Sequence, residues 1–208
     1  MVGTEAVVHI VDDDEAARVG LVELLESVEL GVQTHASAQG FLTDFRNDQT
    51  GCILLDVRMP GMSGLKLQNE LNKRNCRLPI IFLTGHGDVP MAVEALRNGA
   101  FDFVEKPSGG QFLLDKVFDA IEESSRQQDL SDRTRALRTM LASLTPKEEE
   151  VLGYVKQGKR VKIIAMEMGL SRKTVDWHLA MIREKLGVES TGELMLRLHE
   201  AGGLPPTL

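Results

Sequence analysis

Residues 51–65, GCILLDVRMPGMSGL, are the stretch of sequence that decides the fold of this chain. Residues 52–55 are a short run that suits a buried strand, and Asp56 follows directly, where that strand should end. A Pro-Gly pair then interrupts the chain, and a Ser-Gly pair begins a helix. A carboxylate at the carboxyl end of a parallel strand lies on the sheet edge where ligands bind. On its own, however, Asp56 is more simply explained as a turn residue.

Strand and helix patterns alternate five times through the first half of the sequence. Short apolar runs alternate with stretches whose apolar residues recur at helical spacing. This alternation is typical of a parallel sheet with helices on both faces, and thus of an α/β fold. The strands are expected at 6–11, 32–36, 52–55, 79–84 and 101–105, and the helices at 15–30, 38–45, 65–71, 89–97 and 111–123.

The composition is that of a folded protein whose two halves carry different charge. Of the 208 residues, 42% are hydrophobic and 26% are charged, which is ordinary for a globular protein. Residues 1–124 hold 10 Lys and Arg against 20 Asp and Glu, whereas residues 125–208 hold 14 against 11. This contrast predicts two domains with different partners. The small basic surplus of the second half does not by itself indicate nucleic-acid binding.

Membrane and secreted proteins are the classes that the sequence disfavours. No apolar run reaches the length of about 18 residues that a membrane span needs, so no membrane partner is expected. The first residues lack the basic segment of a signal peptide. Cys52 and Cys76 are the two cysteines, and they form neither a disulfide framework nor a metal-binding spacing. We therefore expect a cytoplasmic protein.

Polar side chains follow four of the five predicted strands. Asp12 and Asp13 end the first strand, Asp56 the third, Thr84 the fourth and Lys106 the fifth. In a doubly wound sheet the carboxyl ends of neighbouring strands share one crevice. Three carboxylates there repel one another unless a cation joins them, and Mg²⁺ is a hard divalent ion that prefers oxygen ligands.

The same crevice favours a phosphoryl group as its ligand. Asp56 could act as the nucleophile and form an acyl phosphate, while Mg²⁺ and Lys106 neutralise charge on the transferring oxygens. The Thr84 hydroxyl could donate to a phosphate oxygen. Each residue alone has a plainer explanation, namely an acidic turn, a β-branched strand residue or a surface charge. Their joint occurrence at strand ends is what favours the phosphoryl site.

Residues 4–124 resemble the receiver domain of bacterial two-component response regulators. The matching segments are VDDD, LLDVRMPGMSGL, FLTGHGDV and FVEKP, and residues 84–107 look most like the FixJ type. The resemblance implies a flavodoxin-like (βα)5 fold, a sensor histidine kinase as partner, and phosphorylation of Asp56 by that kinase. It also implies a homodimer on phosphorylation, through a face formed by residues 90–97, 101–105 and 111–120.

The resemblance further assigns roles within the receiver. Asp13 and Asp56 would bind Mg²⁺ together with the backbone carbonyl of Arg58, and Asp12 would bind it through water. Thr84 and Phe103 match the pair of residues that moves on phosphorylation.

Residues 125–142 are predicted to form a helical linker. The stretch is polar and contains neither Gly nor Pro, so a helix that continues from the receiver fits better than a flexible tether. Leu130, Leu137 and Leu141 recur at spacings of seven and four. They could lie against a partner helix or groove, or they could simply be the apolar edge of a solvated linker.

Residues 143–208 have a purely helical pattern, with four helices expected. Thr145 with Glu148 forms a capping box that begins the first helix, and Ser190 with Glu193 offers another for the fourth. Between them, two apolar stripes at helical spacing are joined by a Gly-containing turn, with Ser171 as the next N-cap. This arrangement is a helix-turn-helix, whose second helix enters the major groove of double-stranded DNA.

The outward face of the predicted recognition helix follows from the 100° step between helical residues. Residues opposite its apolar stripe face the bases, and basic or hydroxyl residues on its flanks contact phosphates. Trp177 could pack on a thymine methyl, or equally on the linker or receiver when DNA is absent. The predicted base-facing residues are Lys173, Asp176, Trp177 and Ala180, and the predicted phosphate contacts are Lys162, Arg172, Thr174 and Arg183.

This second half resembles the LuxR-type (NarL/FixJ) DNA-binding domain over about residues 143–201. The matching segments are LTPKEEEVL and AMEMGLSRKTVDWHLAMIREKLGV. The chain departs from many members at Asp176, Trp177 and Ala180, and in the GKRVK segment at 158–162, so the operator sequence stays open. The whole chain is similar to activators of aromatic-hydrocarbon catabolism.

Together these features predict a DNA-binding transcriptional regulator that a kinase switches on by phosphorylating Asp56. It would pair on phosphorylation, bind a promoter, engage RNA polymerase, and catalyse only its own phosphotransfer and dephosphorylation. One alternative keeps the DNA function but makes the receiver a phosphate-independent dimerisation or ligand module. A second is a Mg²⁺-dependent phosphohydrolase with an Asp nucleophile, which would leave the helix-turn-helix unexplained.

Overall fold

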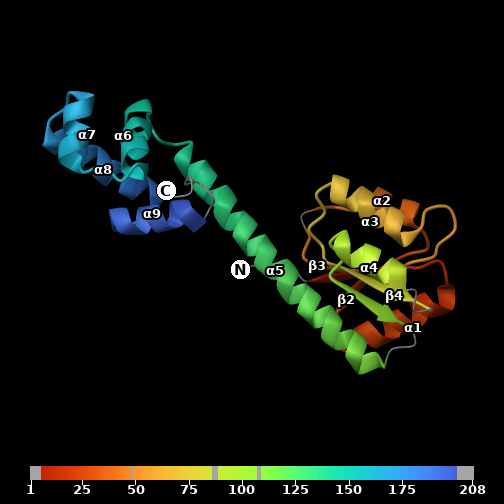
Figure 1. Ribbon diagram of the computed structural model, residues 1–208. Coiled ribbons are helices and arrows are strands. Elements are labelled where there is room, and N and C mark those ends of the chain that lie inside the picture. The colour runs from red at the N-terminus through yellow and green to blue at the C-terminus, as the bar shows by residue number, and fades with distance from the viewer. Residues whose placement is uncertain (1–5, 48, 86–88, 107–108, 201–208) are drawn as a thin grey trace. The chain divides into compact units, whose positions relative to one another are not determined.

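The computed structural model describes residues 6–47, 49–85, 89–106 and 109–200 (Figure 1). Its contacts divide the chain into two compact units, Met1–Asp129 and Leu130–Leu208, which are described separately below. None of the helices in the described residues is long and apolar enough to cross a membrane.

The first unit is built around a parallel sheet of five strands. The strand order is β2-β1-β3-β4-β5, so β3 lies at the centre, between β1 and β4. This confirms the predicted parallel sheet and its five strands. The strands are β1 (Val7–Val11), β2 (Gly31–His35), β3 (Gly51–Asp56), β4 (Ile80–Thr84) and β5 (Asp102–Glu105).

Helices cover both faces of this sheet. Alternate residues of β3 enter different clusters, because Ile53 and Leu55 pack on one face and Cys52 and Leu54 on the other. On the first face lie α2 (Ala38–Asp44), α3 (Gly64–Lys73) and α4 (Val89–Arg97), and on the second lie α1 (Glu15–Glu26) and the first part of α5 (Gly110–Leu141). The two apolar clusters hold the sheet rigid, so its carboxyl edge can position a site.

The first helix is shorter than the sequence predicts. We expected it to run to Leu30 and to end at Gly31, but α1 ends at Glu26. A tight turn follows the helix. In this turn Glu29 has a left-handed φ of 61°, and the Leu30 N–H donates to the Leu25 carbonyl. The apolar spacing continues beyond the helix because Leu30 still packs on the core, and Gly31 instead begins β2.

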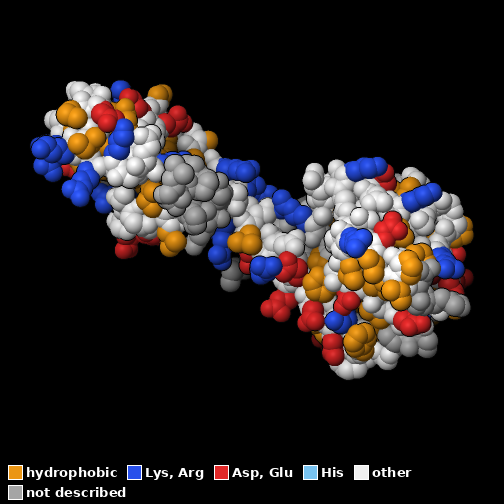
Figure 2. All heavy atoms as spheres, viewed as in Figure 1, with side chains coloured by type: hydrophobic (Ala, Val, Ile, Leu, Met, Phe, Trp, Pro, Cys, Tyr) orange, Lys and Arg blue, Asp and Glu red, His pale blue; other side chains and the backbone are white. Residues whose placement is uncertain are grey.

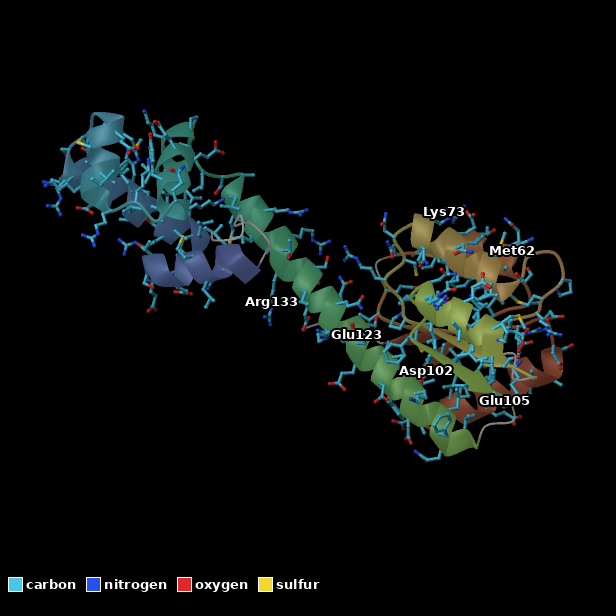
Figure 3. All side chains as sticks on the ribbon, viewed as in Figure 1. Met62, Lys73, Asp102, Glu105, Glu123 and Arg133 are labelled. Carbon is cyan, nitrogen blue, oxygen red and sulfur yellow. The ribbon has the colours of Figure 1, made fainter. Side chains whose placement is uncertain are left out.

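One helix, α5, holds both the last predicted receiver helix and the predicted linker. It is continuous over 32 residues, so the linker is helical, as predicted. Its early apolar residues pack on the sheet, and Ser124 is buried, its hydroxyl accepting from the Gly51 N–H at 3.2 Å. Glu123 and Arg133, labelled in Figure 3, lie in its polar middle. Of the three linker leucines, Leu130 is half exposed, whereas the other two join the core of the second unit.

In its described part, up to residue 200, the second unit contains four further helices, as predicted. The capping box at Thr145 begins α6, and Gly169 and Gly187 close α7 and α8 with left-handed φ angles of 64° and 60°. The predicted apolar stripe of α8 is buried, so the opposite side of this helix faces outward. The helices are α6 (Pro146–Lys156), α7 (Val161–Met168), α8 (Arg172–Leu186) and α9 (Thr191–Glu200).

Candidate functional sites

The predicted acidic residues meet at the carboxyl edge of the sheet. Val11 of β1 is in register with Leu55 of β3, so Asp12 and Asp56, which follow these two residues, lie side by side. Asp12 is buried and Asp56 is partly buried. Two adjacent carboxylates with little solvent need a positive partner to offset their repulsion.

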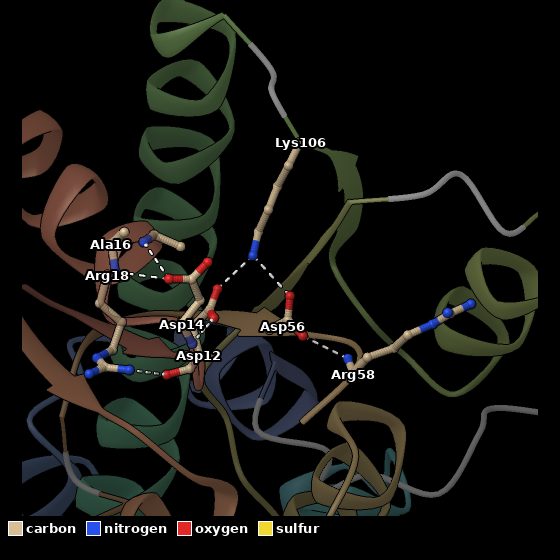
Figure 4. Close-up of polar contacts among 8 residues, drawn as sticks. Asp12, Asp14, Ala16, Arg18, Asp56, Arg58 and Lys106 are labelled. Atoms are coloured by element: carbon tan, nitrogen blue, oxygen red, sulfur yellow. Dashed lines mark hydrogen bonds and ion pairs between the residues drawn. The ribbon is translucent and has the colours of Figure 1, made fainter. Parts of the chain in front are cut away.

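Lys106 supplies that positive partner. Its Nζ lies 2.6 Å from Asp12 Oδ2 and 2.9 Å from Asp56 Oδ1, so one ammonium bridges both carboxylates (Figure 4). Burial alone would lower the pKa of Lys106, but hydrogen bonds and attraction to the two carboxylates outweigh it and raise the pKa. The ammonium therefore stays charged across the neutral range.

The carboxylate of Asp56 is held at both oxygens. Oδ1 accepts from Lys106, and Oδ2 accepts from the backbone N–H of Arg58 at 2.7 Å. The Arg58 side chain itself extends away from Lys106 (Figure 4). A small hollow of about 50 Å³ lies beside this carboxylate, lined by Asp56, Arg58, Thr84 and Gly85. It is large enough for a small polar group or a few waters.

Thr84 and Phe103, the predicted switch pair, lie on neighbouring strands. Thr84 ends β4, is buried, and lines the hollow beside Asp56. Phe103 is partly buried on β5, with its ring centroid 6.1 Å from that of Phe82. The structure thus places Thr84 beside Asp56, as predicted for a residue of this site. Phe103 remains partly exposed to solvent.

The remaining predicted metal ligand, Asp13, is exposed. Asp13 forms no hydrogen bond or ion pair with other described residues, so its carboxylate is available. Within the described ranges no three His, Cys, Asp or Glu side chains form a group able to hold a metal. The donors at this edge are nevertheless carboxylate and carbonyl oxygens, which suit Mg²⁺, an ion that keeps several of its waters.

Sequence reasoning missed Arg18 at this edge of the sheet. Its Nη1 donates to the backbone carbonyl of Asp12 at 2.7 Å (Figure 4). Arg18 lies in α1, six residues after Asp12, and only the turn into this helix brings the two together. The capping carboxylate of Asp14, which accepts from the N–H groups of Ala16 and Ala17, was the one available sign of that turn.

The predicted base-facing residues of α8 are all exposed. Lys173, Asp176, Trp177 and Ala180 lie on its outward side, and the exposed fraction of Trp177 is 57%. The ring of Trp177 packs edge-on against His178, with 4.9 Å between the centroids. Figure 2 shows Lys and Arg side chains gathered over the end of this unit where α7 and α8 lie.

The predicted phosphate contacts differ in their availability. Lys162 and Arg172 are exposed, whereas Thr174 and Arg183 are partly buried. The Thr174 hydroxyl is hydrogen-bonded to the Ser171 hydroxyl at 2.8 Å, and Arg183 Nε donates to the Leu179 carbonyl at 3.2 Å. These two side chains therefore have structural partners within α8 and its cap.

A further contact that sequence reasoning missed fixes α8 to α6. Lys185 Nζ lies 2.6 Å from Glu148 Oε2 and donates to the Ser143 carbonyl at 3.2 Å. Glu148 is buried, and its hydrogen bonds to Lys185 and to the Thr145 backbone lower its pKa. The predicted capping box gave the local role of Glu148, but the helical spacing gave no sign of its partner.

Comparison with known proteins identifies the family of each half of the chain. The receiver domain of response regulators matches residues 8–118, and the LuxR family of bacterial regulatory proteins matches residues 142–198. The transcriptional regulatory protein TdiR of Thauera aromatica is 42% identical over 93% of this chain and 85% of its own length. The transcriptional regulatory protein FixJ of Azorhizobium caulinodans is 40% identical over 95% and 94%.

A solved structure extends the similarity to the whole fold. The response regulator StyR has 38% identity and a TM-score of 0.85 over 94% of this chain and 99% of its own. The resemblance identified from the sequence motifs is thus confirmed for both halves. The chain belongs to the bacterial response regulators that join a receiver domain to a LuxR-type DNA-binding domain, and it is a transcriptional regulator of a two-component system.

Proposed function

We propose that Asp56 is the residue that a sensor histidine kinase phosphorylates. The observation that carries this proposal is the Asp56 carboxylate beside a small hollow that Thr84 also lines, with the Lys106 ammonium 2.9 Å away. In the transfer, the P–N bond to the kinase histidine breaks and a P–O bond to Asp56 forms. Lys106 stabilises the added negative charge, as a preformed cation in a partly buried site does.

Mg²⁺ is the proposed cofactor of this step. Asp12, Asp13, Asp56 and the Arg58 carbonyl would hold it, and when bound it supplies further positive charge to the phosphoryl oxygens. Lys106 already bridges Asp12 and Asp56, and this supports the proposal because the two carboxylates lie close enough to share one cation. Removal of the ion with EDTA should abolish phosphorylation by acetyl phosphate, and labelling that survives EDTA would remove Mg²⁺ from the account.

Thr84 and Phe103 are proposed to convey phosphorylation to the surface. The Thr84 hydroxyl would turn toward a phosphoryl oxygen on Asp56, and the ring of Phe103 would move into the space that this leaves. The position of Thr84 in the lining of the hollow supports the first step, and the partial burial of Phe103 supports the second. Phosphorylation acts as a switch only if it binds one of these arrangements more tightly than the other.

The output is proposed to be a homodimer on promoter DNA. On α4, Val89, Val93 and Leu96 expose 70%, 43% and 48% of their surface at spacings of four and three residues. Such an apolar stripe suits pairing with a second copy. Two copies would place two α8 helices in successive major grooves of a two-fold site.

Engagement of RNA polymerase and activation of transcription complete the proposal. The DNA partner indicates that the protein acts in the cytoplasm, and its catalysis is limited to its own phosphotransfer and dephosphorylation.

A phosphate-independent receiver is the second candidate. Asp56→Asn distinguishes the two, because this variant would still pair and bind DNA fully under the second candidate but not under the first.

The proposed DNA surface can be tested on fragments selected by the phosphorylated protein. We expect Lys173→Ala and Ala180→Glu to weaken binding about tenfold or more, since each removes or opposes a base-edge contact. Lys147→Ala is the matched control, because this exposed lysine lies on α6 and pairs with Glu150. Unchanged affinity of both α8 variants in a mobility-shift assay would show that the outward face is assigned wrongly.

A further inference from the structure

Among the described residues, the Arg18 side chain has one hydrogen bond at the acidic edge, and its acceptor is a backbone carbonyl. Its Nη1 donates to the Asp12 carbonyl at 2.7 Å, and it forms no ion pair with acidic side chains of the described residues (Figure 4). The base of its side chain is fixed as well, because the Arg18 N–H donates to the Asp14 carbonyl at 3.0 Å within the first turn of α1. The guanidinium is thus held by a short, rigid segment.

The Asp12 side chain does not need Arg18 to hold it. Its Oδ1 accepts from the Asp14 N–H at 2.9 Å and its Oδ2 from Lys106 at 2.6 Å. The Asp12 N–H donates to the His35 carbonyl at 3.2 Å. What remains to be fixed is the peptide plane between Asp12 and Asp13, and the carbonyl that Arg18 holds belongs to that plane.

We propose that Arg18 is a positioning residue for Asp13, and that it sets the affinity of the acidic edge for Mg²⁺. This inference rests on the proposed function of that edge. Asp13 is exposed and has no partner among the described residues, so the orientation of its peptide sets the direction in which its side chain leaves the backbone. Because Arg18 bonds to a carbonyl, the Asp13 carboxylate remains available for a cation.

Positioning and simple electrostatics predict opposite effects when Arg18 is replaced. Removal of a positive charge near three carboxylates should by itself strengthen the binding of a cation. Loss of a group that orients a ligand should weaken it, and outer partners of metal ligands typically contribute about tenfold or more in affinity. The sign of the change therefore decides whether Arg18 positions Asp13 or merely adds charge.

Calorimetric titration of the full-length, unphosphorylated protein with Mg²⁺ alone measures this sign. We expect Arg18→Gln to weaken Mg²⁺ binding about tenfold. Arg18→Lys should restore part of the affinity, since an ammonium can donate to the same carbonyl but lacks the planar fork. Arg46→Gln is the matched control, because Arg46 is an exposed arginine of the same unit. The Mg²⁺ affinity of this variant should stay within about twofold of that of the wild type.

The rate of phosphorylation by acetyl phosphate gives a second readout. In Arg18→Gln the half-saturating Mg²⁺ concentration should rise by the same factor, while the rate at saturating Mg²⁺ stays unchanged. Equal or tighter Mg²⁺ binding by this variant, or a lower plateau at an unchanged half-saturation, would overturn the role of Arg18. If Arg18→Gln fails to fold by circular dichroism, Arg18→Met, which likewise removes the donor and the charge, is titrated in its place, and equal or tighter Mg²⁺ binding by that variant overturns the role of Arg18. Wild-type protein that binds no Mg²⁺ would contradict the proposed metal site itself.

Discussion

Gly64 is the residue whose lack of a side chain matters most for the acidic edge. A Cβ atom at this position would lie 2.2 Å from the Asp56 carbonyl oxygen and 3.0 Å from a ring carbon of Phe82. The N–H of Gly64 also donates to the Val57 carbonyl at 3.0 Å, so the start of α3 is held against the end of β3. The close approach of these two backbones fixes the direction of Asp56.

Gly64→Ala should therefore lower both stability and phosphorylation. We expect a loss of about 2 kcal/mol in the free energy of unfolding, because overfilling a packed site forces backbone shifts. Urea unfolding followed by far-UV circular dichroism measures this loss. Trp177, the only tryptophan, reports by fluorescence on the second unit, whose transition should not change.

Gly20→Ala is the matched control for this prediction. It lies in α1 with no atom within 4 Å of the added Cβ, so it should raise stability slightly. Equal effects of the two substitutions would show that the approach of Gly64 to Asp56 is not constraining.

Individual site residues differed in how far the sequence could predict them. Asp56 and Lys106 were predictable because strand ends in a parallel sheet must converge, whatever the details of packing. Arg18 and Lys185 were not, because each bonds to a backbone or side chain that only the packed fold brings near. Thr174 was predicted as a phosphate contact. The hydrogen bond between its hydroxyl and that of Ser171 was not predicted, because this bond arises from the geometry of the helix cap.

The β1 and β2 strands carry a stacked pair of histidines, of which His9 is buried and His35 is partly buried. His9 and His35 stack with 5.8 Å between ring centroids, and both pack edge-on against Phe41 of α2. Burial, and then the neighbouring His35, lower the pKa of His9 to about 4, although Gln49 opposes this with a hydrogen bond. Burial also lowers the pKa of His35, against the opposite effect of Asp44.

The first unit should therefore lose stability as the pH falls from about 6.5 toward 4. In this window the unfolded chain binds a proton at His9 and the folded chain does not, so acid favours unfolding; above pH 7 neither state is protonated. His9 alone should contribute a loss of about 2 kcal/mol between pH 7 and pH 5. Far-UV circular dichroism in urea measures it. His9→Phe should lose less on acidification, and an equal loss in this variant would contradict the account.

Elements were easier to predict than their ends. Five strands and the helices of both halves follow from apolar periodicity, which packing on a sheet or bundle imposes directly. The end of α1 did not follow, since Val28 and Leu30 keep packing on the core from a turn rather than from a helix. The continuity of α5 was predictable in kind, because its polar middle contains no helix breaker.

In the proposed function, pairing of two copies links the phosphorylated receiver to a two-fold DNA site. If Asp56 phosphorylation favours the exposed α4 face for pairing, the dimer fraction should rise on treatment with acetyl phosphate and Mg²⁺. Sedimentation velocity at fixed protein concentration measures it. Val93→Asp, which puts a charge into the apolar stripe of α4, should stay monomeric although it is phosphorylated. No shift in the wild type would instead favour release of the DNA-binding unit without pairing.

The identity of the phosphorylated residue is the claim on which the rest depends, and intact-protein mass measures it directly. Wild-type protein, Asp56→Asn and Asp119→Asn are incubated with Mg²⁺ and acetyl phosphate, Asp119 being an exposed aspartate on α5. We predict an added mass of about 80 Da, one phosphoryl group, in the wild type and in Asp119→Asn, and none in Asp56→Asn. Full labelling of Asp56→Asn would contradict the account and move the nucleophile elsewhere.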